Sequence, residues 1–320
     1  MEQRKLIKLG NSSFAIALPK DWIDKSGLKK GENIFLERNS NGEIIISSSF
    51  KKSDDEKKKV FDFSDINDKK EIEREISVAY VQDYSLFEIN GLNKNKKSEI
   101  KKMLNGLVGM EIVEENDEKI TAKDFFDLSE ANMERFVRRM DNTIRSMFED
   151  LEVGIKSGRL SKTQFDEIYE ADEEINKFYF LINRLLIKGM DNPSILNLLK
   201  TDTASLFNNW WLSYNLEHIG DGVKRIARLL KEEIKEDRLK KISECLLDLR
   251  NKYFDTLNSF YKNDKELAVK ILVEKEEMIK KSDILAQDKE GVIAKIGEKF
   301  KEIVTGIHQI NKIMIYSLGA

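Results

Sequence analysis

The sequence predicts a mainly α-helical protein in which a long run of helices follows a small β module and a short α/β segment. In the C-terminal part of the chain, apolar residues recur at alternating intervals of four and three, which places them on one face of a helix. Prolines, which interrupt helices, occur only at Pro19 and Pro193 in 320 residues. Charged residues make up 35% of the chain, above the roughly one quarter that is usual. These features are typical of amphipathic helices that pack into a bundle.

The first 50 residues predict the β module. Apolar and polar residues alternate in NIFLERNSNGEIIIS (33–47), as in short strands, and Asn41-Gly42 is a signal for a hairpin turn. The module is too small to own a hydrophobic core. Residues 51–67 are charged, contain serine and show no period, so we interpret them as a linker.

Residues 68–126 predict a small α/β adaptor, because a helical pattern, the strand-like YSLFEIN and a second helical pattern follow one another. From residue 127, where DLSE resembles a capping box, only helical patterns follow, through residue 320. Short connections make sequential helices antiparallel neighbours, and we interpret the six helices as two repeats of a three-helix bundle. The predicted helices span 128–157, 161–188, 200–236, 238–262, 264–285 and 288–317. Two apolar stripes face the bundle: Leu212, Leu216, Ile219, Val223, Ile226 and Leu230, and Ile296, Phe300, Ile303, Ile307, Ile310 and Met314.

Composition excludes several classes of protein. A single cysteine, Cys245, rules out an internal disulfide and a cysteine-based zinc site, and it fits a reducing compartment. No apolar run approaches the roughly 18 residues that a membrane span requires. The net charge is −3, but residues 1–50 hold eight Lys/Arg against six Asp/Glu, so the positive balance lies at the N-terminus. We expect a soluble cytoplasmic protein. It is not expected to be an enzyme, because no glycine-rich phosphate loop, nucleophile motif or Cys/His array is present.

Two helical segments carry a family resemblance. YEADEEINKFYFLINRLLI and YNLEHIGDGVKRIARLL are similar to the second and third helices of a PhoU repeat. PhoU proteins regulate phosphate transport, and their fold is two three-helix bundles. The resemblance covers about residues 127–317 and implies metal binding on the bundle surface, through an acidic residue followed four positions later by Asp. Glu217 and Asp221 match that motif fully, whereas Asp172 and Asn176 match it with an amide as the second group.

The spacing of these residues allows two interpretations without the resemblance. Glu217 and Asp221 lie one helical turn apart, where like charges destabilise a helix unless a partner offsets them. A divalent or ferric ion would do so, because carboxylate oxygens are hard ligands. The alternative is a solvated helix face on which Asp221 pairs with Arg225. Asp172 has the same phase on its helix, so the two helices could offer their acids to one region. The predicted metal ligands are Glu217, Asp221, Asp172 and Asn176.

The second repeat does not keep the motif. Its equivalents of Glu217 and Asp221 are Lys301 and Thr305, so only one site is expected. A further group of aromatic residues, Trp210-Trp211 with Phe207 and Tyr214, could form a ligand box, but packing between helices is favoured.

The N-terminal stretch LGNSSFAIALPKDW, followed by GLKKGENIFLE, resembles the AbrB/SpoVT and MazE-type swapped-hairpin fold. That fold is a DNA-binding module completed only when two chains interleave their strands. The resemblance places the DNA-facing residues at Arg4, Lys5, Lys8, Asn11, Ser12 and Lys20. Lys and Arg neutralise phosphates, while Asn and Ser form hydrogen bonds in tight places. Where AbrB carries two adjacent arginines, this chain has Ile23 and Asp24, so a dimerisation module without DNA contact is the alternative.

An AbrB-like module joined to a PhoU-like body resembles archaeal phosphate-uptake regulators. It implies a homodimeric, DNA-binding transcriptional regulator of phosphate transport, whose bundle senses a metal or a transporter partner. The alternative is an accessory protein that docks on a phosphate transporter or sensor kinase and uses the N-terminal module only to dimerise. An antitoxin is disfavoured, because about 190 residues of ordered bundle are not a toxin-wrapping tail.

Overall fold

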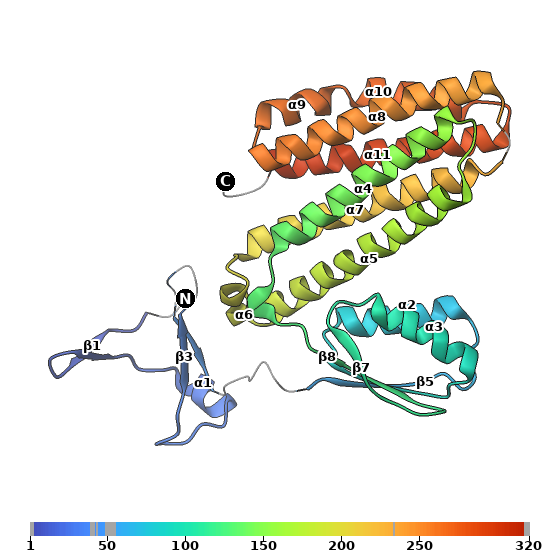
Figure 1. Cartoon of the computed structure of the whole chain (residues 1–320). Helices are drawn as coiled ribbons and strands as arrows, with labels where there is room; N and C mark the ends of the chain where they lie inside the picture. The colour runs from blue at the N-terminus through green and yellow to red at the C-terminus, as the bar shows by residue number, and fades with distance from the viewer. Residues whose placement is uncertain (1–2, 39–41, 43, 49–55, 233, 317–320) are drawn as a thin grey trace. The chain divides into compact units, whose positions relative to one another are not determined.

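The computed structural model describes residues 3–38, 42, 44–48, 56–232 and 234–316 (Figure 1). The chain divides into two compact units, residues 1–55 and 56–320, and each is described by itself.

The described residues of the first unit form two small hairpins and one helix of six residues. Strand β1 (Ile7–Leu9) pairs antiparallel with β2 (Ser13–Ala15), and β3 (Phe35–Arg38) pairs antiparallel with β4 (Ile44–Ser47), in two separate sheets. Helix α1 (Lys20–Lys25) lies between the hairpins in the sequence.

The turns of these hairpins use glycines with positive φ. Gly10 has φ +66° between β1 and β2, and Gly42 has φ +81° between β3 and β4. Asn41, the other residue of the predicted Asn-Gly turn, lies outside the described residues.

The α/β part opens the second unit. Its elements are β5 (Lys58–Asp62), α2 (Lys69–Val81), β6 (Leu86–Asn90), α3 (Lys94–Asn105), β7 (Met110–Glu115) and β8 (Ile120–Asp124). The strand order is β5-β6-β8-β7, with β5 and β6 parallel and the other neighbours antiparallel. Helices α2 and α3 cover one face of the sheet (Figure 1), and Tyr80, Phe87 and Ile100 are buried between helices and sheet.

Strand β5 corrects the predicted linker 51–67, because it lies within that range. Strand β5 lies at the edge of the sheet and buries apolar side chains on only one face, so the lysines around it give the segment the composition of a linker. Phe61 and Phe63 are buried, whereas Lys58, Lys59 and Val60 are exposed.

The helical part confirms the predicted fold class, a mainly α protein after a small β module. A 3-10 turn, η1 (Leu128–Glu130), precedes α4 (Met133–Lys156), α5 (Lys162–Asp191) and α7 (Thr203–Leu229), which form the first three-helix group. The second group holds α8 (Glu236–Lys262), α9 (Lys265–Val273) with α10 (Lys275–Ala286), and α11 (Gly291–Tyr316) (Figure 1). Every residue of the two predicted stripes is buried.

Two helix predictions were wrong in detail. The helix expected over 264–285 is two helices, α9 and α10, that meet at Glu274. The helix expected from 200 begins at Thr203, after the separate short helix α6 (Pro193–Leu198). The reason for the later start is a cap, because the Asp202 side chain accepts a hydrogen bond from the backbone N–H of Ser205.

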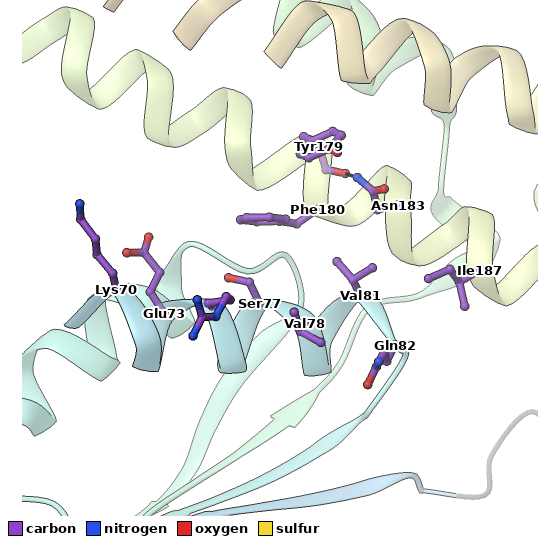
Figure 2. Close-up of a pocket in the computed structure, with 11 residues that line it drawn as sticks. Lys70, Glu73, Ser77, Val78, Val81, Gln82, Tyr179, Phe180, Asn183 and Ile187 are labelled. Atoms are coloured by element: carbon purple, nitrogen blue, oxygen red, sulfur yellow. Dashed lines mark hydrogen bonds between the residues drawn. The ribbon is translucent and has the colours of Figure 1, made fainter. Parts of the chain in front are cut away.

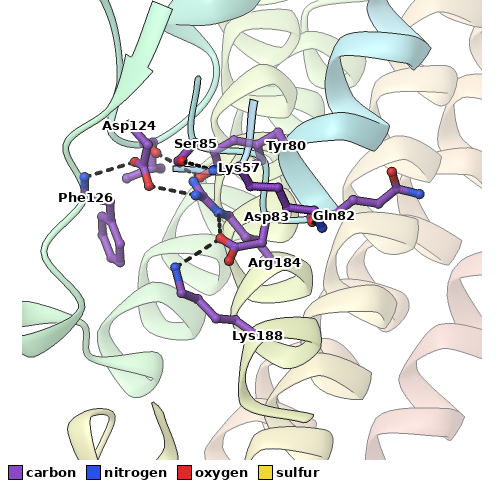
Figure 3. Close-up of polar contacts among 10 residues, drawn as sticks. Lys57, Tyr80, Gln82, Asp83, Ser85, Asp124, Phe126, Arg184 and Lys188 are labelled. Carbon is purple, nitrogen blue, oxygen red and sulfur yellow. Dashed lines mark hydrogen bonds and ion pairs between the residues drawn. The ribbon is translucent and has the colours of Figure 1, made fainter. Parts of the chain in front are cut away.

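A buried arginine connects the α/β part to the bundle (Figure 3). The side chain of Arg184, on α5, is 3% exposed. Its Nε lies 2.9 Å from Asp83 Oδ1, and its Nη2 lies 2.7 Å from Asp124 Oδ2. The guanidinium also stacks 4.7 Å from the ring centroid of Tyr80. Lys188 adds an ion pair of 3.1 Å with Asp83.

No helix among the described residues is long and apolar enough to cross a membrane.

Candidate functional site

The four predicted metal ligands lie on two neighbouring helices. Asp172 and Asn176 are on α5, and Glu217 and Asp221 are on α7, the helix that packs most closely against α5. The Asn176 side chain donates a hydrogen bond of 3.2 Å to Asp172 Oδ2.

Lys224 joins the two helices at this place. Its Nζ lies 2.7 Å from Asp172 Oδ2 and 2.9 Å from Asp221 Oδ1. The other oxygen of Asp221 is 2.6 Å from Nε of Arg225, the ion pair that the sequence left open as an alternative. We refer to Asp172, Asn176, Glu217, Asp221 and Lys224 as the acidic cluster.

Burial sets the electrostatics of the acidic cluster. Burial, together with the nearby carboxylates of Asp221 and Asp172, raises the pKa of Glu217 to about 7. Burial also raises the pKa of Asp172, against the opposing effect of Lys224. For Lys224 burial acts to lower the pKa, but the hydrogen bonds and charges of Asp172 and Asp221 outweigh it and raise the value.

In this structure Asp172 and Asp221 form ion pairs with Lys224 and are not free carboxylates. Within the part of the chain that the structure describes, no group of three or more His, Cys, Asp or Glu side chains could hold one. The ammonium group of Lys224 bridges Asp172 and Asp221, two of the residues that would hold a metal ion. Metal binding therefore stays a prediction, and no step of the proposed function depends on it.

The equivalent place in the second helix group has a different chemistry. Lys301 pairs with Asp283 at 3.1 Å and with Glu298 at 2.8 Å. The hydroxyl of Thr305 donates to the Lys301 carbonyl oxygen. A lysine with two carboxylate partners stands there instead of an acidic pair.

Sequence reasoning missed Lys224. Its spacing from Asp221, three residues along the same helix, is a signal for an ion pair. Its second partner, Asp172, lies 52 residues earlier, so only the packing of α5 against α7 reveals the bridge.

The predicted DNA-facing residues lie on the surface of the first unit. Lys8 is on β1, Asn11 and Ser12 are in the turn to β2, and Lys20 begins α1. The structure thus brings Lys8, Asn11 and Ser12 together on one hairpin, and Arg4 and Lys5 lead into it. All six predicted residues are exposed: Arg4, Lys5, Lys8, Asn11, Ser12 and Lys20.

The same unit exposes its apolar side chains. None of its described residues is buried. Isolated two-stranded hairpins are marginally stable in water, and exposed apolar surfaces of this kind are typical of association sites. Its large exposed apolar residues are Leu6, Ile7, Leu9, Phe14, Ile16, Ile34, Phe35, Leu36 and Ile44.

A groove of about 590 Å³ runs between α2 and α5 (Figure 2). Val78 and Val81 line it from α2, and Phe180 and Ile187 line it from α5. It continues to Asn183, whose side-chain oxygen accepts a hydrogen bond of 2.6 Å from Trp210 Nε1.

The predicted aromatic group lies on α7. The rings of Trp210 and Trp211 have centroids 5.9 Å apart, and both residues pack against the core of the bundle. Phe207 and Tyr214 are 50% and 42% exposed, so the group belongs partly to the helix seam and partly to the surface.

Comparisons with known proteins agree with both parts of the chain. Residues 137–230, from α4 to the C-terminal end of α7, match the family model of the PhoU domain. Residues 7–57 match the family model described as antidote-toxin recognition MazE, bacterial antitoxin. No curated protein and no solved structure matches the chain. Residues 7–57 are therefore similar to a MazE-type module and residues 137–230 to a PhoU domain, in the order that the two motifs predicted, and the acidic cluster lies within the second matched segment.

Proposed function

We propose that the protein is a DNA-binding transcriptional regulator of phosphate uptake, which dimerises through residues 1–50. The observation that carries the proposal is the first unit: a MazE-like module that leaves all its described residues unburied and exposes Lys8 on a hairpin that Arg4 and Lys5 precede. A second copy would cover the apolar side chains by interleaving its own hairpins. The two copies of the hairpin that carries Lys8 would then lie on one dimer.

The contacts with DNA would be mainly electrostatic. Arg4, Lys5 and Lys8 supply positive charge to the duplex phosphates, which carries affinity but little sequence information. Asn11 and Ser12, at the tip of the β1–β2 hairpin, are the candidates for hydrogen bonds to base edges. A regulator of this kind needs both contributions.

The helical part would supply the regulation. A PhoU domain implies a partner in the phosphate-transport system, a transporter or a sensor kinase, and the exposed aromatic residues on α7 offer a contact surface. A partner that binds one arrangement of the dimer better would shift DNA occupancy by its differential affinity. Because Arg184 ties the α/β part to the bundle, the two would move together.

One observation favours a second candidate, a PhoU-type accessory protein that uses the N-terminal module only to pair chains. Helix α1 carries Asp21 and Asp24 next to Lys20, and Ile23 stands where AbrB-type modules have an arginine. Two carboxylates beside a DNA-facing lysine oppose binding to phosphates.

The salt dependence of DNA binding separates the two candidates. Fluorescence anisotropy with labelled promoter DNA of a phosphate-transport operon would be recorded at several salt concentrations. We expect affinity to fall steeply with salt, and the variant with both Lys5→Ala and Lys8→Ala to flatten the log-log slope by roughly four, because a dimer loses four phosphate contacts at about 0.9 each.

A matched control is the double variant Lys265→Ala and Lys270→Ala, which removes two lysines of α9. It should keep the slope of the wild type. Absence of binding at low salt, or an equal slope in all three proteins, would favour the accessory protein.

A further inference from the structure

We propose that Lys224 is a built-in cation of the acidic cluster, which takes the place of a metal ion between α5 and α7. The inference does not depend on DNA binding, since it concerns the bundle alone. In this chain the ammonium group of Lys224 balances the acidic motif, and no metal is needed there.

The geometry of Lys224 is the first argument. A metal at this motif would link the carboxylates of two helices, and Lys224 Nζ makes that link, at 2.7 Å to Asp172 on α5 and 2.9 Å to Asp221 on α7. Both distances are those of charge-assisted hydrogen bonds. A hard cation held by the same two oxygens would require the ammonium to leave.

Burial is the second argument. The side chain of Asp172 is 6% exposed and that of Lys224 is 21% exposed. An ionised carboxylate that is buried without a cation is costly, so the ionised form of Asp172 requires a partner. Lys224 is part of the chain and is always available as a partner. A metal ion must come from solution, and the positive charge of Lys224 repels it.

The charge count is the third argument. Asp172, Glu217 and Asp221 bring three carboxyl groups, and Lys224 and Arg225 bring two cations. Removing Lys224 would leave carboxylate oxygens and the Asn176 amide between two helices, a donor set that suits Mn²⁺ or Mg²⁺. The inference therefore predicts a latent oxygen-ligand site that Lys224 closes.

The test compares full-length wild type with Lys224→Met, which removes the charge and keeps most of the apolar stem. The matched control is Arg225→Met, since Arg225 also pairs with Asp221 but its side chain is 54% exposed. Mn²⁺ is the probe, followed by isothermal titration calorimetry and by electron paramagnetic resonance of the free ion. We expect saturable binding to Lys224→Met, at least about tenfold tighter than to wild type or Arg225→Met.

A second measurement does not depend on the folding of a variant. Thermal unfolding of the wild type, with and without millimolar Mn²⁺ or Mg²⁺, should give the same midpoint, because a ligand that does not bind the folded state does not stabilise it. Stoichiometric metal in purified wild type, or a raised midpoint that Asp221→Asn abolishes, would overturn the proposal. So would a folded Lys224→Met protein that binds Mn²⁺ no better than the wild type.

Discussion

Arg184 is a buried charged residue at the contact between the α/β part and the bundle. It stands between Asp83 and Asp124, on the sheet side of α5, and Nη1 has no hydrogen-bond partner among the described residues (Figure 3). Removing one partner of a buried ion pair leaves the others without compensation. Because these residues connect the α/β part to the bundle, the loss would act on the contact between the two.

We therefore expect Arg184→Ala to lower the free energy of unfolding by about 3–5 kcal/mol. Arg139→Ala is the matched control, because Arg139 pairs with Glu174 at 2.6 Å but its side chain is 62% exposed. Exposed pairs contribute about 0–1 kcal/mol, so the control should stay within that range. Urea unfolding followed by circular dichroism measures both. Equal losses in the two variants would contradict the role given to Arg184.

The environment of His308 leads us to expect that the free energy of unfolding depends on pH. Burial, with the charges of Lys275 and Lys312, lowers the pKa of this histidine on α11 to about 4, and Nδ1 is buried without a partner in the described structure. The unfolded chain takes up a proton near pH 6.5. The unfolded state thus binds more protons between pH 6.5 and 4, and folding stability falls as the pH decreases through that window.

His308→Gln should remove this component. Urea midpoints at pH 7.5 and 5.5 would be compared for wild type, His308→Gln and His218→Gln, the variant that removes the other histidine of the chain. We expect the fall in midpoint from pH 7.5 to 5.5 to be smaller in His308→Gln than in the wild type. An unchanged fall would show that the imidazole is solvated in the folded protein.

At the level of elements, the sequence predicted what depends on local periodicity. The stripe from Leu212 to Leu230 is buried as expected, because one apolar side chain per turn leaves a helix a single face to bury. The same helical period places Glu217 and Asp221 one turn apart on one face, so their proximity could be predicted from the sequence. The partner Lys224–Asp172 could not be predicted, since it depends on the register of α5 against α7.

The break between α9 and α10 shows the limit of such predictions. The sequence KILVEKEEMIKK contains neither glycine nor proline around Glu274, so it gives no stop signal. Strand β5 was hidden for another reason, because an edge strand with one apolar side between lysines has the composition of a linker. Neither feature has a signal in its local sequence.

The contact of α11 with α10 provides the prediction at this scale. A Cβ on Gly297 would lie 2.2 Å from the backbone nitrogen of Ala286 and 2.7 Å from its Cα, so these backbones approach too closely for any side chain. We expect Gly297→Ala to destabilise the protein by about 1–3 kcal/mol, because the helix must shift to make room.

Gly291 is the matched control on the same helix. A Cβ there meets nothing within 4 Å, so Gly291→Ala should be neutral or stabilise by up to about 1 kcal/mol through its higher helix propensity. Thermal unfolding of the two variants gives the comparison. A Gly297→Ala protein as stable as Gly291→Ala would mean that α10 and α11 are further apart than described.

At the scale of the whole molecule, the two units differ in how they are stabilised. The described residues of 56–320 form two hydrophobic cores, one between the α/β sheet and its helices and one within the bundle. The first unit has none among its described residues, although Phe14, Leu36 and Ile44 are 60%, 66% and 67% exposed. We expect this module to gain a core by association with a second copy, so that folding of the N-terminus and dimerisation are one event.

Charges placed on this surface test that expectation in the full chain. Phe14→Glu combined with Leu36→Glu should turn the dimer into a monomer, because burying two unpaired carboxylates per chain costs more than the apolar contacts contribute. Val273→Glu is the matched control, since Val273 on α9 is 77% exposed and far from the module in sequence. Light scattering at micromolar concentration should report twice 37.2 kDa for wild type and Val273→Glu, and 37.2 kDa for the double variant. Circular dichroism of the bundle helices should be the same in all three. A double variant that stays dimeric would place the interface on the bundle, and a monomeric wild type would contradict the swapped-hairpin module itself.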